Sequence, residues 1–366
     1  MGKRRQVLKG LAAAGLAPIW RPVTLFAAEP LADDRFAAVN TSLVEFHGAP
    51  RFHRFYETAA TLAAALQGYN AGDVTRDEAV AAFDAALDAW MGCQHLRMGA
   101  LELKMRDFRV EFWPDKKNRV GKQLNEALTA QRADLLDPAV MADASVALQG
   151  FPALERLLFE DPVAPGGYGG KLAAAIGDNL AAIAGNLDVA WASGGTTAEL
   201  LLNPAPDGSR FAAVKDVAAA FVSALATQLE FVAERKLAAP LGVSVEKARP
   251  RLAESWRSGR SMANVTANLA AMVELYVGPG GHPGLMTLVE QAGFAELAQN
   301  IKTLVERAHQ TSAGLGPDLD DLLDDEAARA AIETVIDDAN GARRLAAGDM
   351  AGALGLILGF NSLDGD

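Results

Sequence analysis

The sequence is poor in cysteine, in aromatic side chains and in long apolar runs. Cys93 is the only cysteine among 366 residues, so the chain cannot close an internal disulfide. Aromatic residues make up only 7% of the chain, although half of it is hydrophobic. Alanine and leucine supply most of the apolar surface and β-branched runs are scarce, which is typical of an all-α protein with a large buried core.

Several catalytic signatures are also missing. The chain has no HExxH zinc motif, no CxxC pair, no Walker loop and no GxGxxG turn. No strained nucleophile elbow is evident. The aspartates between Asp318 and Asp325 lack the glycine and glutamate spacing of an EF-hand loop. The chain therefore lacks the local signatures of zinc peptidases, redox dithiols, nucleotide-binding proteins and EF-hand proteins.

The first 28 residues are set apart by their charge. The segment Lys3-Arg4-Arg5-Gln6-Val7-Leu8-Lys9 precedes a short apolar run from Gly10 to Ile19. That order is typical of a twin-arginine export signal, and the run, interrupted by Pro18, is too short to span a membrane. We therefore predict a signal peptide over residues 1–28 and a periplasmic mature protein. A basic arm that binds an anionic partner is the alternative.

Removal of this segment makes the chain more acidic. It holds five basic residues and no acidic one, so the net charge would move from −12 to −17. Such a charge disfavours binding to nucleic acid and to anionic membranes, and is compatible with cations or cationic ligands. We expect no nucleic-acid partner and no integral membrane segment.

Apolar residues recur three and four positions apart through most of the chain, which predicts a series of amphipathic helices. Thr75 and Glu78 form a capping-box pattern for a helix expected to reach about Phe108. Beyond them, helices are expected near 120–135, 139–160, 171–192, 214–237, 261–276, 285–312 and 326–348. The pattern predicts an all-α fold of two tandem four-helix-bundle-like domains, 29–195 and 209–366, with a Gly- and Pro-rich linker at 196–208. We hypothesise that they arose by duplication.

The stretch Gln149-Gly150-Phe151-Pro152-Ala153-Leu154-Glu155 predicts a sharp turn into a helix. Gly150 lets the backbone turn, and Pro152 fits the start of a helix, where no N–H donor is lost. Glu155 is then expected in the first helical turn, where free N–H groups favour a carboxylate. Either the turn simply starts a helix that Glu155 caps, or it delivers an acid to a functional site.

Polar side chains also interrupt the apolar helix expected before Phe108. His95 and Glu102 are seven residues apart, which would place them on one helical face, and Arg97 belongs to a neighbouring polar stripe. Such groups either face solvent or are placed deliberately in a core. The turn Trp113-Pro114-Asp115 should end this helical unit, because a proline disfavours helical backbone in the residue before it.

These segments resemble the imelysin family, whose hallmark is a G-x-H-x-x-E motif. Gly150 and Glu155 match that motif, but Pro152 stands at the position of the histidine. The resemblance extends to Trp90, Glu102, the Trp113-Pro114-Asp115 turn, the E-S-x-x-S-x-x-S-like segment Glu254-Ser255-Trp256-Arg257-Ser258-Gly259-Arg260-Ser261, and the ending Gly359-Phe360-Asn361-Ser362-Leu363-Asp364-Gly365-Asp366. It covers nearly the whole mature chain and implies two helical bundle domains packed together.

The resemblance also implies a role and a set of candidate residues. Imelysin-like proteins are generally linked to bacterial iron uptake, so the resemblance implies a periplasmic protein that handles iron, haem or a chelate, together with other envelope iron-uptake components. The candidates for the motif and for ligand binding are Gly150, Pro152, Glu155, Arg97, Glu254, Ser255, Arg257 and Ser261. The candidate metal ligands are Glu155, His95, Glu102 and Asp115, whose oxygen-rich character permits iron or another divalent metal.

The replaced histidine decides between binding and catalysis. Pro152 has no lone pair to offer a metal, so a metallopeptidase site at this motif would lack one ligand. We expect a ligand- or metal-binding protein without peptidase activity, in which Arg97, Arg257 and Ser261 hold an anionic ligand or satisfy buried carboxylates. A metal-dependent peptidase of the imelysin type and an envelope protein-interaction module are the alternatives.

Overall fold

The computed structural model describes residues 31–207 and 209–358, and helices are the only regular structure in that part of the chain. The all-α prediction is therefore confirmed. The predicted signal peptide at 1–28 and the Gly359–Asp366 ending lie outside the described residues. The longer helices of the first half are α1 (Asp33–Ser42), α2 (Ala49–Ala71), α3 (Arg76–Cys93), α5 (Arg119–Ala130) and α8 (Tyr168–Trp191), and the shorter ones are α4 (Arg106–Val110), α6 (Pro138–Asp143), α7 (Gly150–Glu155) and α9 (Thr196–Leu202).

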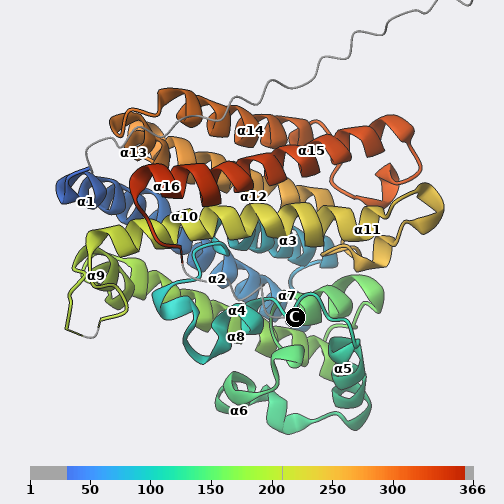
Figure 1. Ribbon diagram of the computed structural model, residues 1–366. Helices are drawn as coiled ribbons and strands as arrows, with labels where there is room; N and C mark the ends of the chain where they lie inside the picture. The colour runs from blue at the N-terminus through green and yellow to red at the C-terminus, as the bar shows by residue number, and fades with distance from the viewer. Residues whose placement is uncertain (1–30, 208, 359–366) are drawn as a thin grey trace, which may run out of the picture.

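The first group of helices is built around α2, which packs against both α3 and α8. Phe52, Phe55, Leu62 and Leu66 follow one another at helical spacing along α2, and all four are fully buried. The predicted capping box is confirmed at the start of α3, where Thr75 and Glu78 satisfy each other's backbone N–H groups. The helices α5 and α6 lie at the lower end of this group (Figure 1).

The second group contains four long helices that pack on one another. They are α10 (Val214–Glu230), α12 (Ser261–Val277), α14 (Ala295–Ala313) and α15 (Glu326–Arg344), with the shorter α11 (Ala239–Leu241), α13 (Leu285–Gln291) and α16 (Ala351–Leu354) beside them. The stretch Val214–Leu241 is long and apolar enough to cross a membrane, yet 72% of its most apolar window is buried inside the protein. Its composition is therefore that of a bundle core.

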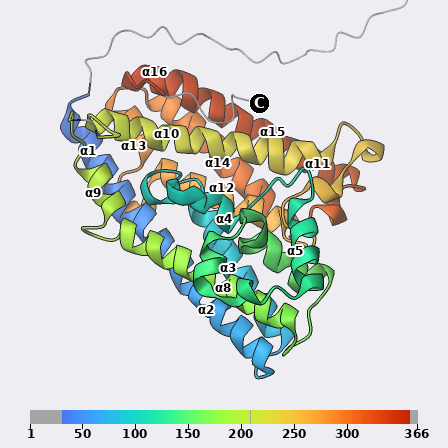
Figure 2. The same ribbon diagram turned by 90° about the horizontal axis from the view of Figure 1, so that it is seen from below.

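The two groups meet along α3 and α12, which pack directly against each other. The Asn268 side chain donates to the backbone oxygen of Met91 across this contact at 2.7 Å. The first helix, α1, packs on α10 of the second group. Figures 1 and 2 show α2 and α8 on one side of the molecule and α10 with α14 and α15 on the other.

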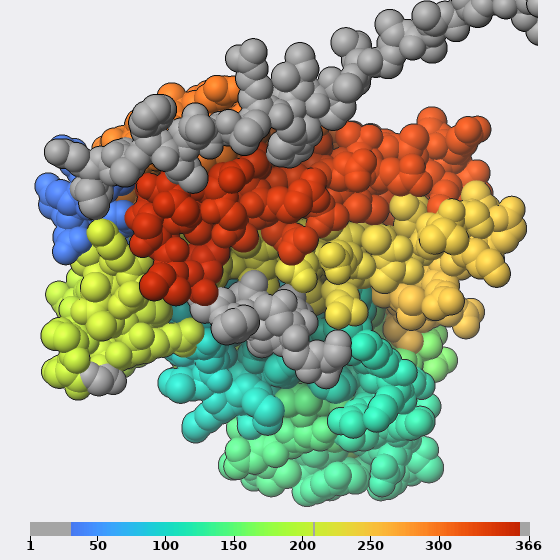
Figure 3. Space-filling model, in the orientation of Figure 1, coloured from blue at the N-terminus to red at the C-terminus, as the bar shows by residue number. Residues whose placement is uncertain are grey.

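The proposed linker is not wholly irregular, because α9 occupies Thr196–Leu202 within it. The domain boundaries and the duplication stay predictions. In the space-filling view, the segment around residues 100–120, in cyan to teal, lies next to the second group and below it in the picture (Figure 3). This junction contains the candidate site.

The structure corrects several predicted helices. The helix predicted at 139–160 is divided into α6 and α7 by extended backbone at Ala144 and the turn at Gly150, and the helix predicted at 285–312 is divided into α13 and α14 at Gly293. The helix that begins after Thr75 ends at Cys93 instead of continuing to Phe108. After Gln94 the backbone N–H groups bond to carbonyls only two or three residues back, and Met98 is extended at φ −146° and ψ 153°, so the α-helical hydrogen-bond pattern stops. His95 and Glu102 consequently lie on an irregular segment with short 3₁₀ turns and do not share a helical face.

Four helices contain wide π-helical turns, at Leu43–Gly48, Arg156–Glu160, Phe231–Ala238 and Leu345–Met350. Such turns are uncommon and often occur near functional sites. Three of the four carry residues described below: His47, Glu160 and Lys236.

Candidate functional site between the helical groups

The Gly150 turn brings α7 against the segment that follows α4. Gly150 has φ = 67°, and a Cβ atom there would lie 2.1 Å from the Val110 backbone oxygen. The preceding residue, Gln149, is fully buried and is held by Asn179, whose side chain donates to it at 2.8 Å. Only glycine satisfies both the backbone angle and the close approach. Pro152 is half-buried in the first turn of α7 and lines the cavity described next.

The sequence predicted Glu155 in the first turn of its helix, but the residue lies at the end of α7. The left-handed Gly150 lets the helix begin early, so that the acid follows several residues later. Its carboxylate is buried and accepts hydrogen bonds from the Ser258 N–H at 3.0 Å and the Ser258 hydroxyl at 2.8 Å. Burial raises the pKa of Glu155, while these hydrogen bonds and Arg257 act in the opposite direction. Glu155 thus links the first helical group to the second.

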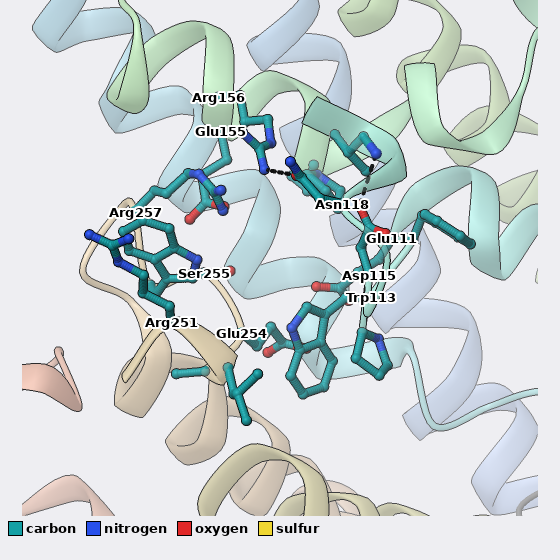
Figure 4. Close-up of a pocket in the computed structure, with 18 of the residues that line it drawn as sticks. Glu111, Trp113, Asp115, Asn118, Glu155, Arg156, Arg251, Glu254, Ser255 and Arg257 are labelled. Atoms are coloured by element: carbon teal, nitrogen blue, oxygen red, sulfur yellow. Dashed lines mark hydrogen bonds between the residues drawn. The ribbon is translucent and has the colours of Figure 1, made fainter. Parts of the chain in front are cut away.

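A cavity of about 450 Å³ lies at this link, and we call it the interbundle pocket. Figure 4 shows its side chains converging from both helical groups. The walls combine acidic, basic and aromatic groups: Glu111, Phe112, Trp113, Pro114, Asp115, Lys116, Asn118, Val120, Phe151, Pro152, Glu155, Arg156, Glu160, Arg251, Leu252, Ala253, Glu254, Ser255, Trp256 and Arg257. Of the predicted ligand-binding and metal residues, it brings together Pro152, Glu155, Asp115, Glu254, Ser255 and Arg257.

Glu254 forms the buried end of the pocket and pairs with Lys236. The ammonium of Lys236 lies 2.6 Å from Glu254 Oε2, and both side chains are about 2% exposed or less. Asn264 donates to the same oxygen at 2.8 Å. Glu254 Oε1 is buried and has no hydrogen-bond donor among the described residues. Ser261 fixes the segment by donating to the Glu254 backbone oxygen at 2.7 Å, and Ser255 adopts a left-handed φ of 52°.

Glu111 is a pocket residue that the sequence reasoning missed. It accepts a hydrogen bond from the Trp90 indole at 2.6 Å. Burial and then the Glu254 charge raise the pKa of Glu111 well above its usual range, and Lys236 and Trp90 oppose them. The raised pKa favours the neutral form of the Glu111 carboxyl. Its only sequence signal was its position two residues before Trp113.

Basic side chains surround the mouth of the pocket. Arg156 and Arg257 both pair with Glu160, Arg257 through its Nε at 2.7 Å. Trp256 lies between two guanidinium groups, with Arg257 at 4.2 Å and Arg251 at 5.5 Å from its ring centre. Arg251 has no ion-pair partner among residues 31–207 and 209–358. The mouth therefore offers a flat aromatic surface and a free cation.

The remaining predicted residues have other contacts. Asp115 caps α5 by accepting from the Arg119 and Val120 N–H groups at 2.8 Å. Glu102 pairs with Arg210 at the surface. Arg97 is exposed, lies 4.0 Å from Asp107 and does not reach the pocket.

His95 is buried in a second polar cluster. Its Nε2 lies 2.9 Å from Nε2 of His47, whose Nδ1 lies 2.8 Å from Glu274. Arg51 Nε also lies 3.2 Å from His47 Nδ1, and His95 Nδ1 is buried without a hydrogen-bond partner among the described residues. Burial lowers the pKa of His47 to about 4 and that of His95 well below its usual value.

The four predicted metal ligands are not assembled into one set. Glu155 bonds to Ser258, Asp115 caps a helix, Glu102 pairs with Arg210, and His95 pairs with His47. Within the described ranges, no three His, Cys, Asp or Glu side chains converge in a way that could hold a metal ion. These residues do not fit a shared bare ion.

The chain resembles one protein family in sequence and two solved structures in fold. The imelysin family model matches residues 48–345. The structure of an imelysin-like protein from Psychrobacter arcticum superposes with a TM-score of 0.75 at 17% identity, over 92% of this chain and 100% of that one. A protein from Parabacteroides distasonis, assigned as an iron-regulated protein A precursor, superposes with a TM-score of 0.71 at 15% identity, over 87% of this chain and 96% of that one.

Both similarities concern the fold, because the sequence identities are low. No curated protein matches the chain. The interbundle pocket is therefore the feature of this chain that bears on its role.

Proposed function

This chain belongs to the imelysin family, and from that premise we propose that it is a ligand-binding protein of bacterial iron acquisition that does not cut peptides. The ligand site is the interbundle pocket. The ligand is an anionic iron chelate, held by the basic mouth and by Trp256. The predicted export signal supports a periplasmic location.

One observation carries this proposal. The motif acid of the first helical group and the 254–257 segment of the second close the same cavity, so that neither group forms the pocket alone (Figure 4). Clefts of a few hundred Å³ with aromatic walls and a few fixed polar groups are typical of small-molecule sites. Here Trp256 supplies the flat wall and Arg251 the unpaired cation.

The acidic groups of the pocket favour a chelate over a bare cation. Lys236 pairs with Glu254, the raised pKa of Glu111 favours its neutral form, and Glu155 accepts hydrogen bonds from Ser258. None of the three carboxyls offers a free negative charge to an incoming metal ion. An anionic chelate would instead meet Arg251 and Arg257 at the mouth.

The motif also supports binding without proteolysis. Pro152 replaces the histidine of the family motif and contributes no donor atom. The carboxylate that remains is turned toward Ser258. The name of the Parabacteroides protein refers to iron regulation, and we extend an iron-related role to this chain as part of the proposal.

Calorimetric titration of the mature protein with ferric citrate tests the ligand site. Arg251→Gln and Trp256→Leu should each weaken binding by about ten-fold, which corresponds to about 1.4 kcal/mol for a lost charge-assisted or cation–π contact. Glu333→Gln serves as the matched control, because Glu333 is exposed on α15 and lies outside the interbundle pocket. Equal affinity in all three variants would contradict the pocket assignment.

Digestion of casein, with and without a chelator, tests the absence of peptidase activity. We expect no cleavage above the level of Glu155→Gln protein prepared in parallel. Chelator-sensitive cleavage that disappears in Glu155→Gln would show that the protein is a metallopeptidase.

A further inference from the structure

A second cavity, which we call the basic groove, lies on the other side of the 111–116 segment. Its volume is about 1040 Å³, and it runs between residues 95–119 of the first helical group and the α10 helix with its Phe231–Ala238 continuation. The groove and the interbundle pocket share only the wall formed by residues 111–116. Motif residues Pro152 and Glu155 do not line the groove.

The groove has an aromatic wall. Trp113 and Phe231 meet edge to face with ring centres 5.6 Å apart, and Arg97 lies over the Phe231 ring at 5.9 Å. Phe112 and the buried Met98 extend this apolar surface. Such a wall can contact the flat, apolar part of an organic molecule.

The groove carries more basic than acidic side chains, although the whole chain is acidic. Six basic and five acidic side chains line it, whereas the chain as a whole has a net charge of −12. Among the residues that the structure describes, four of the bases have no ion-pair partner: Lys116, Lys117, Arg119 and Arg235. An unpaired cationic cluster is unexpected on so acidic a protein, unless it serves an anion.

The acids of the groove, by contrast, are all engaged within the protein. Glu102 pairs with Arg210 and Asp107 lies beside Arg97. Asp115 and Asp216 cap α5 and α10 through backbone N–H groups. Glu111 accepts a hydrogen bond from the Trp90 indole.

We propose that the basic groove is a binding site for a small organic polyanion, an aromatic polycarboxylate in chemical class, which is separate from the interbundle pocket. The four unpaired bases bind its carboxylates, and Trp113 with Phe231 contacts its ring. This site does not depend on iron.

Glu111 tunes the site, because it stands in the shared wall where an ionised carboxylate would repel the ligand. Burial and the neighbouring Glu254 charge raise the pKa of Glu111 well above its usual range, which favours its neutral form. A neutral Glu111 would leave six basic and four acidic charges around the groove. Affinity should therefore fall as the pH rises and Glu111 ionises.

Calorimetric titration of the full mature chain with benzene-1,2,4-tricarboxylate tests the groove, with citrate and inorganic phosphate as comparison probes. We expect the aromatic tricarboxylate to bind more tightly than either, and its binding to weaken as salt is added. Arg235→Gln and Lys117→Gln should each weaken it by about ten-fold. Lys247→Gln, an exposed residue outside both cavities, should bind like the wild type.

Further outcomes separate this site from the interbundle pocket. Trp256→Leu should leave tricarboxylate binding unchanged, and Glu111→Gln should retain it while removing its alkaline decline. The inference is overturned if none of the probes binds saturably, or if Arg235→Gln and Lys117→Gln bind as the wild type does. It is also overturned if Trp256→Leu is the variant that loses binding. Matching circular dichroism spectra and melting temperatures establish that each variant is folded.

Discussion

Removal of the Lys236 side-chain charge should be among the most damaging single changes in the protein. Its ammonium lies 2.6 Å from Glu254 Oε2, and the two side chains are 1% and 2% exposed. The Lys236→Met variant keeps most of the buried volume but leaves a carboxylate in the interior without its cation. Loss of one partner of a buried ion pair typically destabilises a protein by about 3–5 kcal/mol.

That magnitude is large against a total stability of about 5–15 kcal/mol for a typical folded domain. Asn264 still donates to Glu254 in the variant, which favours the lower end of the range. Urea unfolding followed by tryptophan fluorescence measures the deficit.

The double variant Lys236→Met with Glu254→Gln supplies the decisive comparison. With no charge left at this position, it should be more stable than Lys236→Met alone, and the coupling energy should reach about 2 kcal/mol. The reasoning fails if Lys236→Met lies within about 1 kcal/mol of the wild type, which is the range of an exposed ion pair. It also fails if the two single changes simply add.

Three further predictions concern other parts of the structure. Gly150→Ala should lower the free energy of unfolding, measured in urea, by about 2 kcal/mol or more. Gly150 has a left-handed φ, and a Cβ atom there would lie 2.1 Å from the Val110 backbone oxygen. Gly348→Ala is the matched control, because a Cβ atom at Gly348 would meet open space. Burial lowers the pKa of His47 to about 4, so the unfolded chain binds a proton at this histidine at a higher pH than the folded protein does. The free energy of unfolding should therefore fall by up to about 3 kcal/mol as the pH drops from 6.5 to 4. A plot of the urea midpoint against pH should be flatter for His47→Gln. Cys93 is fully buried and burial raises the pKa of its thiol, so a thiol reagent should react only after unfolding in urea; rapid labelling of the native protein would contradict that environment.

Helix positions could be predicted well from the sequence because they depend on local periodicity. The spacing along α2 and α8, and the capping box at Thr75, were sufficient to locate those helices. The end of α3 was predicted wrongly, since the apolar pattern continues past Cys93. The chain leaves the helix at Gln94, and the next residue, His95, is buried against His47. A contact between residues so distant in the chain leaves no local pattern.

The candidate site was predicted in part for the same reason. The sequence singled out Glu155 and the 254–261 segment, and the structure brings Glu155, Glu254, Ser255 and Arg257 to one pocket. Glu111 and Lys236 were missed, because a lone acid or lysine in the sequence is usually a solvated residue. Their importance comes from burial and from each other, and both depend on how the two helical groups pack. His95 was selected as a ligand, but its partner is another histidine on a different helix.

The position of α1 has a consequence for how the polypeptide can be divided. Phe36 and Val39 on α1 are almost completely buried, and the helix packs on α10, far along the chain. A fragment that starts at residue 209 would therefore leave a hydrophobic strip of α10 bare to water, and would be prone to self-association. Co-expression of that fragment with residues 29–195 would restore the missing cover, so the two pieces should assemble as a complementation pair.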